Sequence, residues 1–161
     1  MNNLTLNQVL FIITSDKLQG DESMIVMVCV DNRMGVMFNK RRQSRDRELC
    51  ARVIELTKDK RLFLSSYSAS LFGEFTKDMI VGDDFLKKAE NGDFCFVEGK
   101  DLLPYINKTE KIIVFKWNRD YPFDKKLDVD LSNGWIVEKV EEFNGTSHDK
   151  ITMEVYVRKS L

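Results

Sequence analysis

The residue types best suited to chemistry lie together in one basic stretch that contains a single acid, Asp46. Apolar residues at helical spacing follow this acid, which places it at the start of a predicted helix, at the edge of the core. There it could bind a protonated heterocycle or transfer a proton, and partial burial would raise its pKa. Alternatively, Asp46 only stabilises the helix N-terminus or pairs with Arg42 or Arg45.

The cations around Asp46 predict a second function for the same stretch. Arginine side chains bind phosphate or carboxylate with two parallel hydrogen bonds, so Arg41, Arg42 and Arg45 favour a small anionic ligand, such as a nucleotide or a phosphorylated metabolite. Nucleic acid is a weaker interpretation, because no aromatic residues interleave with the arginines. A solvated loop and helix surface explains the same pattern. The cations are Lys40, Arg41, Arg42, Arg45 and Arg47.

The remaining candidates are weaker. His148 is the only histidine, so a histidine-rich metal site is excluded and we expect no metal; a surface position in a loop is the simplest interpretation of this residue. Ser66 and Ser68 could contact a phosphate, although turn and capping roles explain them equally well. Trp117 and Tyr121 are expected to pack. The sequence has no GxSxG or P-loop motif to support serine hydrolysis or phosphoryl transfer.

Length and composition predict an ordinary cytoplasmic protein. The 161 residues suit a single domain, and a net charge of -1 argues against general binding of polyanions. No apolar run reaches the roughly 18–20 residues of a membrane span, and the features of a signal peptide are missing. The three cysteines form no CxxC motif and are expected to be reduced thiols. We interpret residues 1–23 as an N-terminal extension and residues 24–161 as one domain.

Strands and helices alternate in the first two thirds of the chain and give way to two long strands. This order predicts an α/β fold with a mainly parallel central sheet, flanking helices and a C-terminal antiparallel hairpin. Residues 112–115 are apolar on both faces, so their strand should be central and parallel. Ser44 could cap the first helix. The expected strands are 24–30, 61–65, 79–81, 94–98, 111–117, 135–141 and 151–158, and the expected helices are 44–57, 67–72, 83–90 and 100–107.

From about Met24 to its end, the chain resembles dihydrofolate reductase and its relatives. Residues 24–31 followed by Gly35 resemble the opening strand of that family, and Asp46 falls near its substrate-binding acid. Residues 96–100 resemble its glycine turn. The resemblance implies a substrate pocket beside Asp46 and a cofactor turn at Glu98 and Gly99, which would make NADPH a possible cofactor.

The chain departs from the family where the reductase chemistry is carried. The usual tryptophan and proline before the acid are missing from residues 40–45. The paired glycines that approach the cofactor pyrophosphate are reduced to Glu98-Gly99, and a carboxylate there would repel phosphate. The turn after the second strand offers uncharged hydroxyls, from Ser65, Ser66 and Ser68, in place of the usual glycine, arginine and threonine.

Three hypotheses follow. The first is a dihydrofolate reductase-like domain without that activity, which binds a small anionic or nucleotide-like ligand near Asp46. The second is an NAD(P)H-dependent reductase with an altered substrate. The third is a non-catalytic interaction protein that uses residues 1–23, in which an apolar run from Leu10 to Ile13 could cover a partner surface.

Overall fold

The computed structural model describes residues 23–160, so almost all of the predicted extension lies outside the described residues. No helix in this range is long and apolar enough to cross a membrane. The elements are β1 (Met24–Val30), β2 (Gly35–Phe38), β3 (Arg41–Arg42), α2 (Arg47–Leu56), β4 (Leu62–Leu64), α3 (Ser66–Ala69), the 3₁₀ helix η1 (Gly73–Asp78), β5 (Ile80–Val81), α4 (Phe85–Lys88), β6 (Phe94–Phe96), the 3₁₀ helix η2 (Leu103–Lys108), β7 (Thr109–Lys116), β8 (Lys125–Lys126), β9 (Trp135–Phe143) and β10 (Ile151–Arg158).

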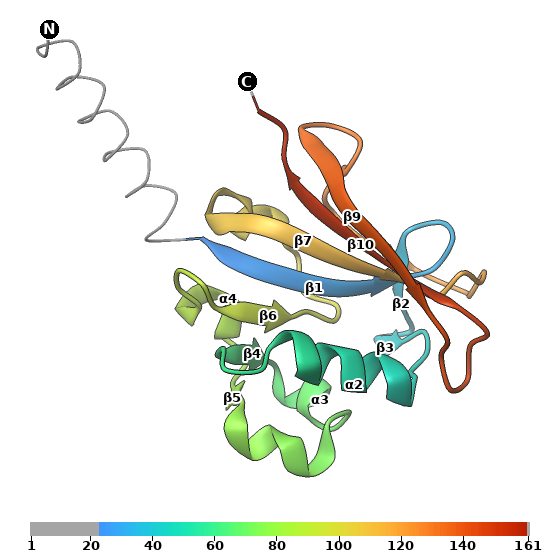
Figure 1. Ribbon diagram of the computed structural model, residues 1–161, viewed down its shortest axis with the longest axis horizontal. Helices are drawn as coiled ribbons and strands as arrows, with labels where there is room; N and C mark the ends of the chain where they lie inside the picture. The colour runs from blue at the N-terminus through green and yellow to red at the C-terminus, as the bar shows by residue number, and fades with distance from the viewer. Residues whose placement is uncertain (1–22, 161) are drawn as a thin grey trace, which may run out of the picture.

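A seven-stranded sheet forms the centre of the molecule (Figure 1). Its strand order is β5-β4-β6-β1-β7-β10-β9. All neighbours from β5 to β7 run parallel, whereas β10 runs antiparallel to both β7 and β9. The predicted α/β fold, with a mainly parallel sheet and a C-terminal antiparallel hairpin, is confirmed.

Strand β7 has a continuous apolar run because both of its faces are buried. Ile112 and Val114 point into the cluster on one face of the sheet, whereas Ile113 and Phe115 point into the cluster on the other. All four are buried, because helices or loops cover both faces here. The strand is parallel to β1 on one side and antiparallel to β10 on the other, so it is central but not parallel on both sides.

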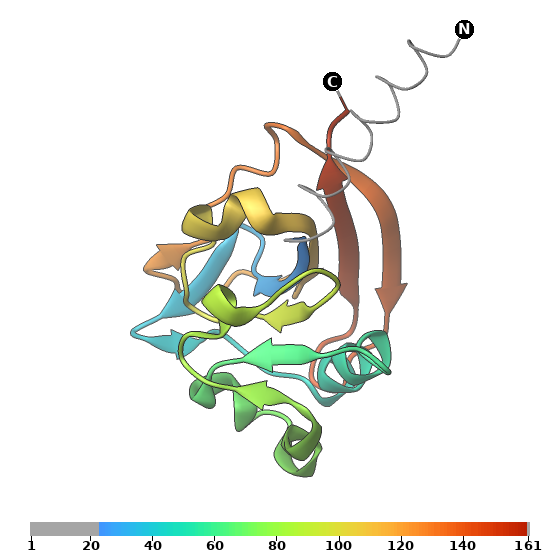
Figure 2. The same ribbon diagram turned by 90° about the vertical axis from the view of Figure 1, so that its left-hand side faces the viewer.

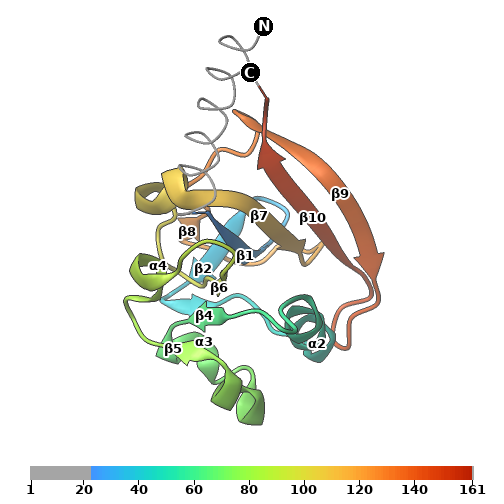
Figure 3. The same ribbon diagram turned by 60° about the vertical axis from the view of Figure 1, so that its left-hand side comes forward.

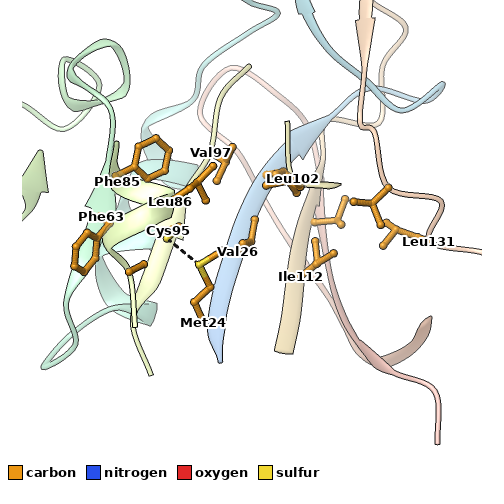
Figure 4. Packing of buried hydrophobic residues seen from close by; sticks show 14 of the residues in the cluster. Met24, Val26, Phe63, Phe85, Leu86, Cys95, Val97, Leu102, Ile112 and Leu131 are labelled. Atoms are coloured by element: carbon orange, nitrogen blue, oxygen red, sulfur yellow. Dashed lines mark hydrogen bonds between the residues drawn. The ribbon is translucent and has the colours of Figure 1, made fainter. Parts of the chain in front are cut away.

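The two faces of the sheet are covered by different helices (Figure 3). Phe85 and Leu86 of α4 pack on one face, in the cluster that Figure 4 shows from close by. Leu49 and Val53 of α2 pack on the other face. These two residues are four positions apart and therefore share one side of the helix. Full burial of side chains of this size stabilises the fold by about 1.5–3 kcal/mol each, which anchors α2 to the sheet.

A second, small sheet holds the segment between β1 and α2 (Figure 2). Its strand order is β3-β2-β8, and both pairings are antiparallel. Asp31 shapes the turn into β2, because its Oδ1 accepts hydrogen bonds from the amides of Arg33 (2.9 Å) and Gly35 (2.8 Å). This sheet therefore fixes where the basic stretch runs across the molecule.

Candidate functional site

Asp46 is the N-cap of α2. Its Oδ1 accepts hydrogen bonds from the amides of Glu48 (2.9 Å) and Leu49 (3.4 Å). These amides belong to the first helical turn, where no backbone carbonyl is available to them. The helix begins at Arg47, so the prediction that Ser44 caps it is wrong.

The same carboxylate holds the loop between β9 and β10. Its oxygens accept from the amides of Thr146 (2.9 Å) and Ser147 (2.8 Å), and Oδ2 lies 3.0 Å from Nδ1 of His148. His148 stands 102 positions further along the chain. Asp46 therefore joins the start of α2 to the hairpin loop.

His148 is buried, with only 3% of its surface exposed. Its ring stacks on Trp117, with 4.5 Å between the ring centroids. Its Nε2 lies 2.8 Å from Oη of Tyr121 and 3.2 Å from Oγ of Ser44. The prediction of a surface histidine is wrong, because Trp117 covers one ring face and Asp46 accepts from the ring.

The pKa of Asp46 is lowered, whereas the sequence analysis expected it to be raised. Burial alone would raise it, but hydrogen bonds from Thr146, His148, Ser147 and Glu48 together have the larger, opposite effect. Asp46 is therefore a carboxylate at neutral pH and an acceptor rather than a proton donor. Its side-chain partner is His148 and not an arginine.

Arg42 forms an ion pair with Glu98. Its Nε and Nη2 lie 2.9 Å and 3.1 Å from the two carboxylate oxygens, and both side chains are largely shielded from solvent. Its guanidinium also stacks over the ring of Tyr67. This ion pair occupies a crevice at the carboxyl ends of β1 and β6, where open α/β sheets bind ligands, and the void beside it measures only about 10 Å³. A separate pocket of about 630 Å³ is lined by Glu98 and Gly99.

The two serines predicted to contact a phosphate are placed differently. Ser68 is buried and donates a hydrogen bond to Glu98 (2.9 Å), while its amide donates to Oγ of Ser65. Ser66 is exposed at the first position of α3. Only Ser66 thus remains open to solvent, and neither residue lies in a pocket with the arginines.

The turn at Glu98 and Gly99, which lines the pocket of about 630 Å³, packs closely on Met37. Gly99 has a φ of 77°, and a Cβ there would meet Cε of Met37 at 2.8 Å. The amides that begin η2, those of Leu102 and Leu103, already donate to the carboxylate of Asp128 (3.0 Å and 2.9 Å). These two amides are therefore already satisfied by a carboxylate of the chain itself.

Two adjoining pockets lie beside Asp46. The arginine pocket, of about 680 Å³, is lined by Arg41, Arg42, Ser44, Arg45, Tyr67 and Ser147. The apolar groove, also of about 680 Å³, has side chains of α2 on one wall and residues 71–75 on the other. Arg45 and Ser147 line both. The groove's apolar lining consists of Cys50, Ala51, Ile54, Leu71, Phe72 and Phe75.

The cysteines form neither a disulfide nor a metal site within residues 23–160. Burial raises the pKa of Cys50 to about 11 and that of Cys95 to about 12. Both are therefore protonated thiols at neutral pH, which makes them poor nucleophiles.

Comparison with solved structures identifies the fold. Dihydrofolate reductase from Enterococcus faecalis, solved as a complex with NADP(H) and RAB-propyl, superimposes with a TM-score of 0.62. The match covers 89% of this chain and 99% of that one. This chain has a dihydrofolate reductase-like fold. The two sequences are only 12% identical, so the likeness concerns the fold alone. No protein-family model and no curated protein matches the sequence.

Sequence reasoning identified Asp46 and the arginines but missed the group around His148. Asp46 and His148 are brought together by the sheet, and no spacing in the sequence relates them. Trp117 and Tyr121 were expected to pack, which they do, but Tyr121 also bonds to His148. The small residues Gly145, Thr146 and Ser147 were the available signal, because such a loop can turn its amides toward a buried anion.

Proposed function

We propose that this dihydrofolate reductase-like domain binds a small amphipathic anion in the arginine pocket and the apolar groove, and that it does not reduce dihydrofolate. The observation that carries the proposal is the position of Arg45, which lines both pockets. A ligand with a ring in the groove and a charged group among the arginines would use both. A nucleotide-like molecule has this form.

The charges of the arginine pocket favour this ligand. Arg41 and Arg45 are exposed, and neither has a carboxylate partner among residues 23–160. Asp46, the nearest acid in sequence, already has its charge balanced by amides and by His148. An anion would therefore meet unpaired guanidinium groups, which bind phosphate, sulfonate or carboxylate through charge-assisted hydrogen bonds.

The closed crevice argues against the reductase hypothesis. Open α/β sheets bind their ligands at the carboxyl ends of the strands, where Arg42 and Glu98 pair in this protein, and breaking a shielded ion pair is costly. Calorimetric titration with NADPH tests this point. We expect no binding, and tight NADPH binding with turnover of dihydrofolate would overturn the proposal.

Titration with naphthalene sulfonate, an amphipathic anion that cannot be hydrolysed, tests the pocket. Arg45→Gln should weaken binding about tenfold, which corresponds to about 1.4 kcal/mol. Ala51→Trp should block the groove and abolish binding, since Ala51 is an exposed residue of its lining. Lys139→Gln, which removes the same charge on β9, is the matched control. Equal affinities for all four proteins would refute the assignment.

A further inference from the structure

Ser44 lies where the Asp46–His148 pair meets the arginine pocket. Its Oγ is 3.2 Å from Nε2 of His148, whose Nδ1 is 3.0 Å from Oδ2 of Asp46. Ser44 also lines the arginine pocket, whereas Asp46 and His148 are buried behind it. A hydroxyl, an imidazole and a carboxylate thus follow one another from the pocket to the interior.

The hydrogen bonds fix the tautomer of the neutral imidazole. Asp46 is ionised and can only accept, so Nδ1 of His148 carries the proton. In the neutral ring Nε2 is then an acceptor and faces Ser44. Stacking on Trp117 holds the plane of the ring. This is the arrangement of nucleophile, base and orienting carboxylate, which is recognised by geometry rather than by a sequence motif.

We propose that Ser44 is a nucleophile that cleaves carboxylic esters bearing an anionic group, with His148 as its base and Asp46 as a positioning residue. The inference rests on the anion pocket proposed above, because the substrate's charge would be held by the arginines beside Ser44. It adds to that function that the bound anion is an ester, which the protein cleaves.

The reaction needs only the ester and water. Oγ of Ser44 bonds to the acyl carbon while its proton passes to Nε2 of His148. The bond from the acyl carbon to the leaving oxygen then breaks, and His148 returns the proton to this oxygen, which releases the alcohol. Water attacks the acyl-serine in the same way, gives one proton to His148, and releases the acid as the proton returns to Ser44.

Side chains would have to stabilise the negative charge that develops in the transition state. The amides of Thr146 and Ser147 are the nearest loop donors, but both already donate to Asp46. Arg41 and Arg45 line the same pocket as Ser44, so one of them can stabilise the oxyanion while the other holds the anionic group of the substrate. Anionic esters should therefore react faster than neutral ones.

The hydroxyl of Tyr121 offers the sharpest test of whether Ser44 and His148 are catalytic or only structural. Its Oη lies 2.8 Å from Nε2, closer than Ser44, and 3.3 Å from Oγ of Ser44. While Tyr121 donates to Nε2, this nitrogen cannot accept the proton of Ser44. Removing the hydroxyl should thus free the base and make Ser44 more reactive, whereas a purely structural network would only be weakened.

The first experiment treats the full-length protein with a fluorophosphonate, which reacts with activated serines, and locates the label by mass spectrometry. We expect a single label on Ser44. Ser44→Ala should abolish labelling, and Ser132→Ala, at an exposed serine before β9, should leave it unchanged. An unlabelled wild type, or a label on another serine, overturns the proposal.

The second experiment measures hydrolysis of nitrophenyl succinate, an anionic ester. His148→Gln should lower kcat at least about 100-fold, the range of a lost general base. Asp46→Asn should lower kcat more than it raises KM, because its main effect is on the orientation of the base. Tyr121→Phe should raise the rates of labelling and hydrolysis. Slower reaction of Tyr121→Phe, with its fold intact by circular dichroism, contradicts the assigned roles.

Naphthalene sulfonate separates this proposal from the function on which it rests. Calorimetric titration of the wild type with the sulfonate measures the pocket without any reaction at Ser44. Binding without labelling or hydrolysis would refute the role of Ser44 and leave the pocket standing. Labelling of Ser44 without sulfonate binding would refute the pocket and leave the activated serine standing.

Discussion

Asp46 connects two parts of the chain through one carboxylate. It accepts from the first turn of α2, from the hairpin loop and from the ring of His148. Loss of the charge would weaken these hydrogen bonds and leave fewer acceptors than donors, and unsatisfied buried groups cost more than an average hydrogen bond contributes. The residue is therefore important for stability, whatever the site binds.

Asp46→Asn should lower the free energy of unfolding by about 3 kcal/mol at neutral pH, the scale of losing hydrogen bonds to a charged acceptor. Because the pKa of Asp46 is lowered in the folded protein, its stabilising effect is complete above the unfolded pKa of about 3.9. The effect is lost as the pH falls toward the folded pKa. Urea unfolding of both proteins between neutral and acid pH should therefore show the difference shrinking below about pH 4.

Asp149→Asn is the control for this measurement, since Asp149 is an exposed acid in the same loop. Its stability should follow that of the wild type at every pH. A constant difference between the wild type and Asp46→Asn down to the lowest pH at which they fold would contradict the role of the charge.

The sequence located Asp46 correctly but predicted the opposite pKa shift. Helical spacing placed the acid beside the core, and burial was the only effect that could be read from that position. The donors that reverse the shift come from Thr146, Ser147 and His148, which are local to the site only after the sheet has formed. Long-range hydrogen bonds of this kind have no signature in a single sequence.

At the scale of elements, the β9–β10 hairpin must approach Asp46 closely, and Gly145 makes this possible. A Cβ at this position would lie 2.6 Å from Oδ2 of Asp46 and 2.7 Å from the carbonyl oxygen of His148. One of these contacts is to backbone, so the loop itself would have to move.

Gly145→Ala should lower the free energy of unfolding by about 1–3 kcal/mol, the cost of overpacking. It should also slow any labelling of Ser44, because His148 moves with the loop. Gly82→Ala is the matched control: its Cβ would come no closer than 3.3 Å to a heavy atom, the Oδ1 of an exposed Asp84. Equal stabilities of the two variants in urea unfolding would argue against a tight loop.

The long strands were predictable and the short elements were not. Alternating or continuous apolar residues marked β1, β7, β9 and β10 nearly to their ends. The strands of the small sheet are two to four residues long and carry no period. The helix expected at 100–107 is a 3₁₀ helix that starts at Leu103, with Pro104 in its first turn and Asp128 bound to its first amides.

At the scale of the whole molecule, the strand order of the sheet determines how well each strand is protected from hydrogen exchange. β1 and β7 each lie between two neighbours, whereas β5 and β9 form the edges. β5 is two residues long, and β9 exposes Val137 and Val140. Edge strands leave alternate backbone groups unpaired, so these should open first.

Hydrogen exchange of the full-length protein should therefore be slowest in β1 and β7, intermediate in β10, and fastest in β5 and on the outer edge of β9. Mass spectrometry of peptides from these strands measures the order. Protection of β9 equal to that of β1 would contradict a free edge, and dilution of the sample would show whether a second copy covers it.

The overall topology was predictable because it depends on few features. Alternating strands and helices followed by a hairpin leave few ways to arrange a sheet. The closed crevice was not predictable, although one sign of it was Glu98, which stands before Gly99 where the family usually has a second glycine. Its closure depends on Arg42 crossing from β3 to Glu98 at the end of β6, and the length of this reach could not be foreseen from either residue.

The stacking of Trp117 on His148 has an optical consequence. The chain has two tryptophans, and the other, Trp135, lies under the guanidinium of Arg158. An imidazole stacked on an indole face affects its emission, so the fluorescence of Trp117 reports whether the two rings stay stacked. A protein carrying Trp135→Phe would emit from Trp117 alone. The response of this ring pair to an added ligand could then be followed without any attached dye.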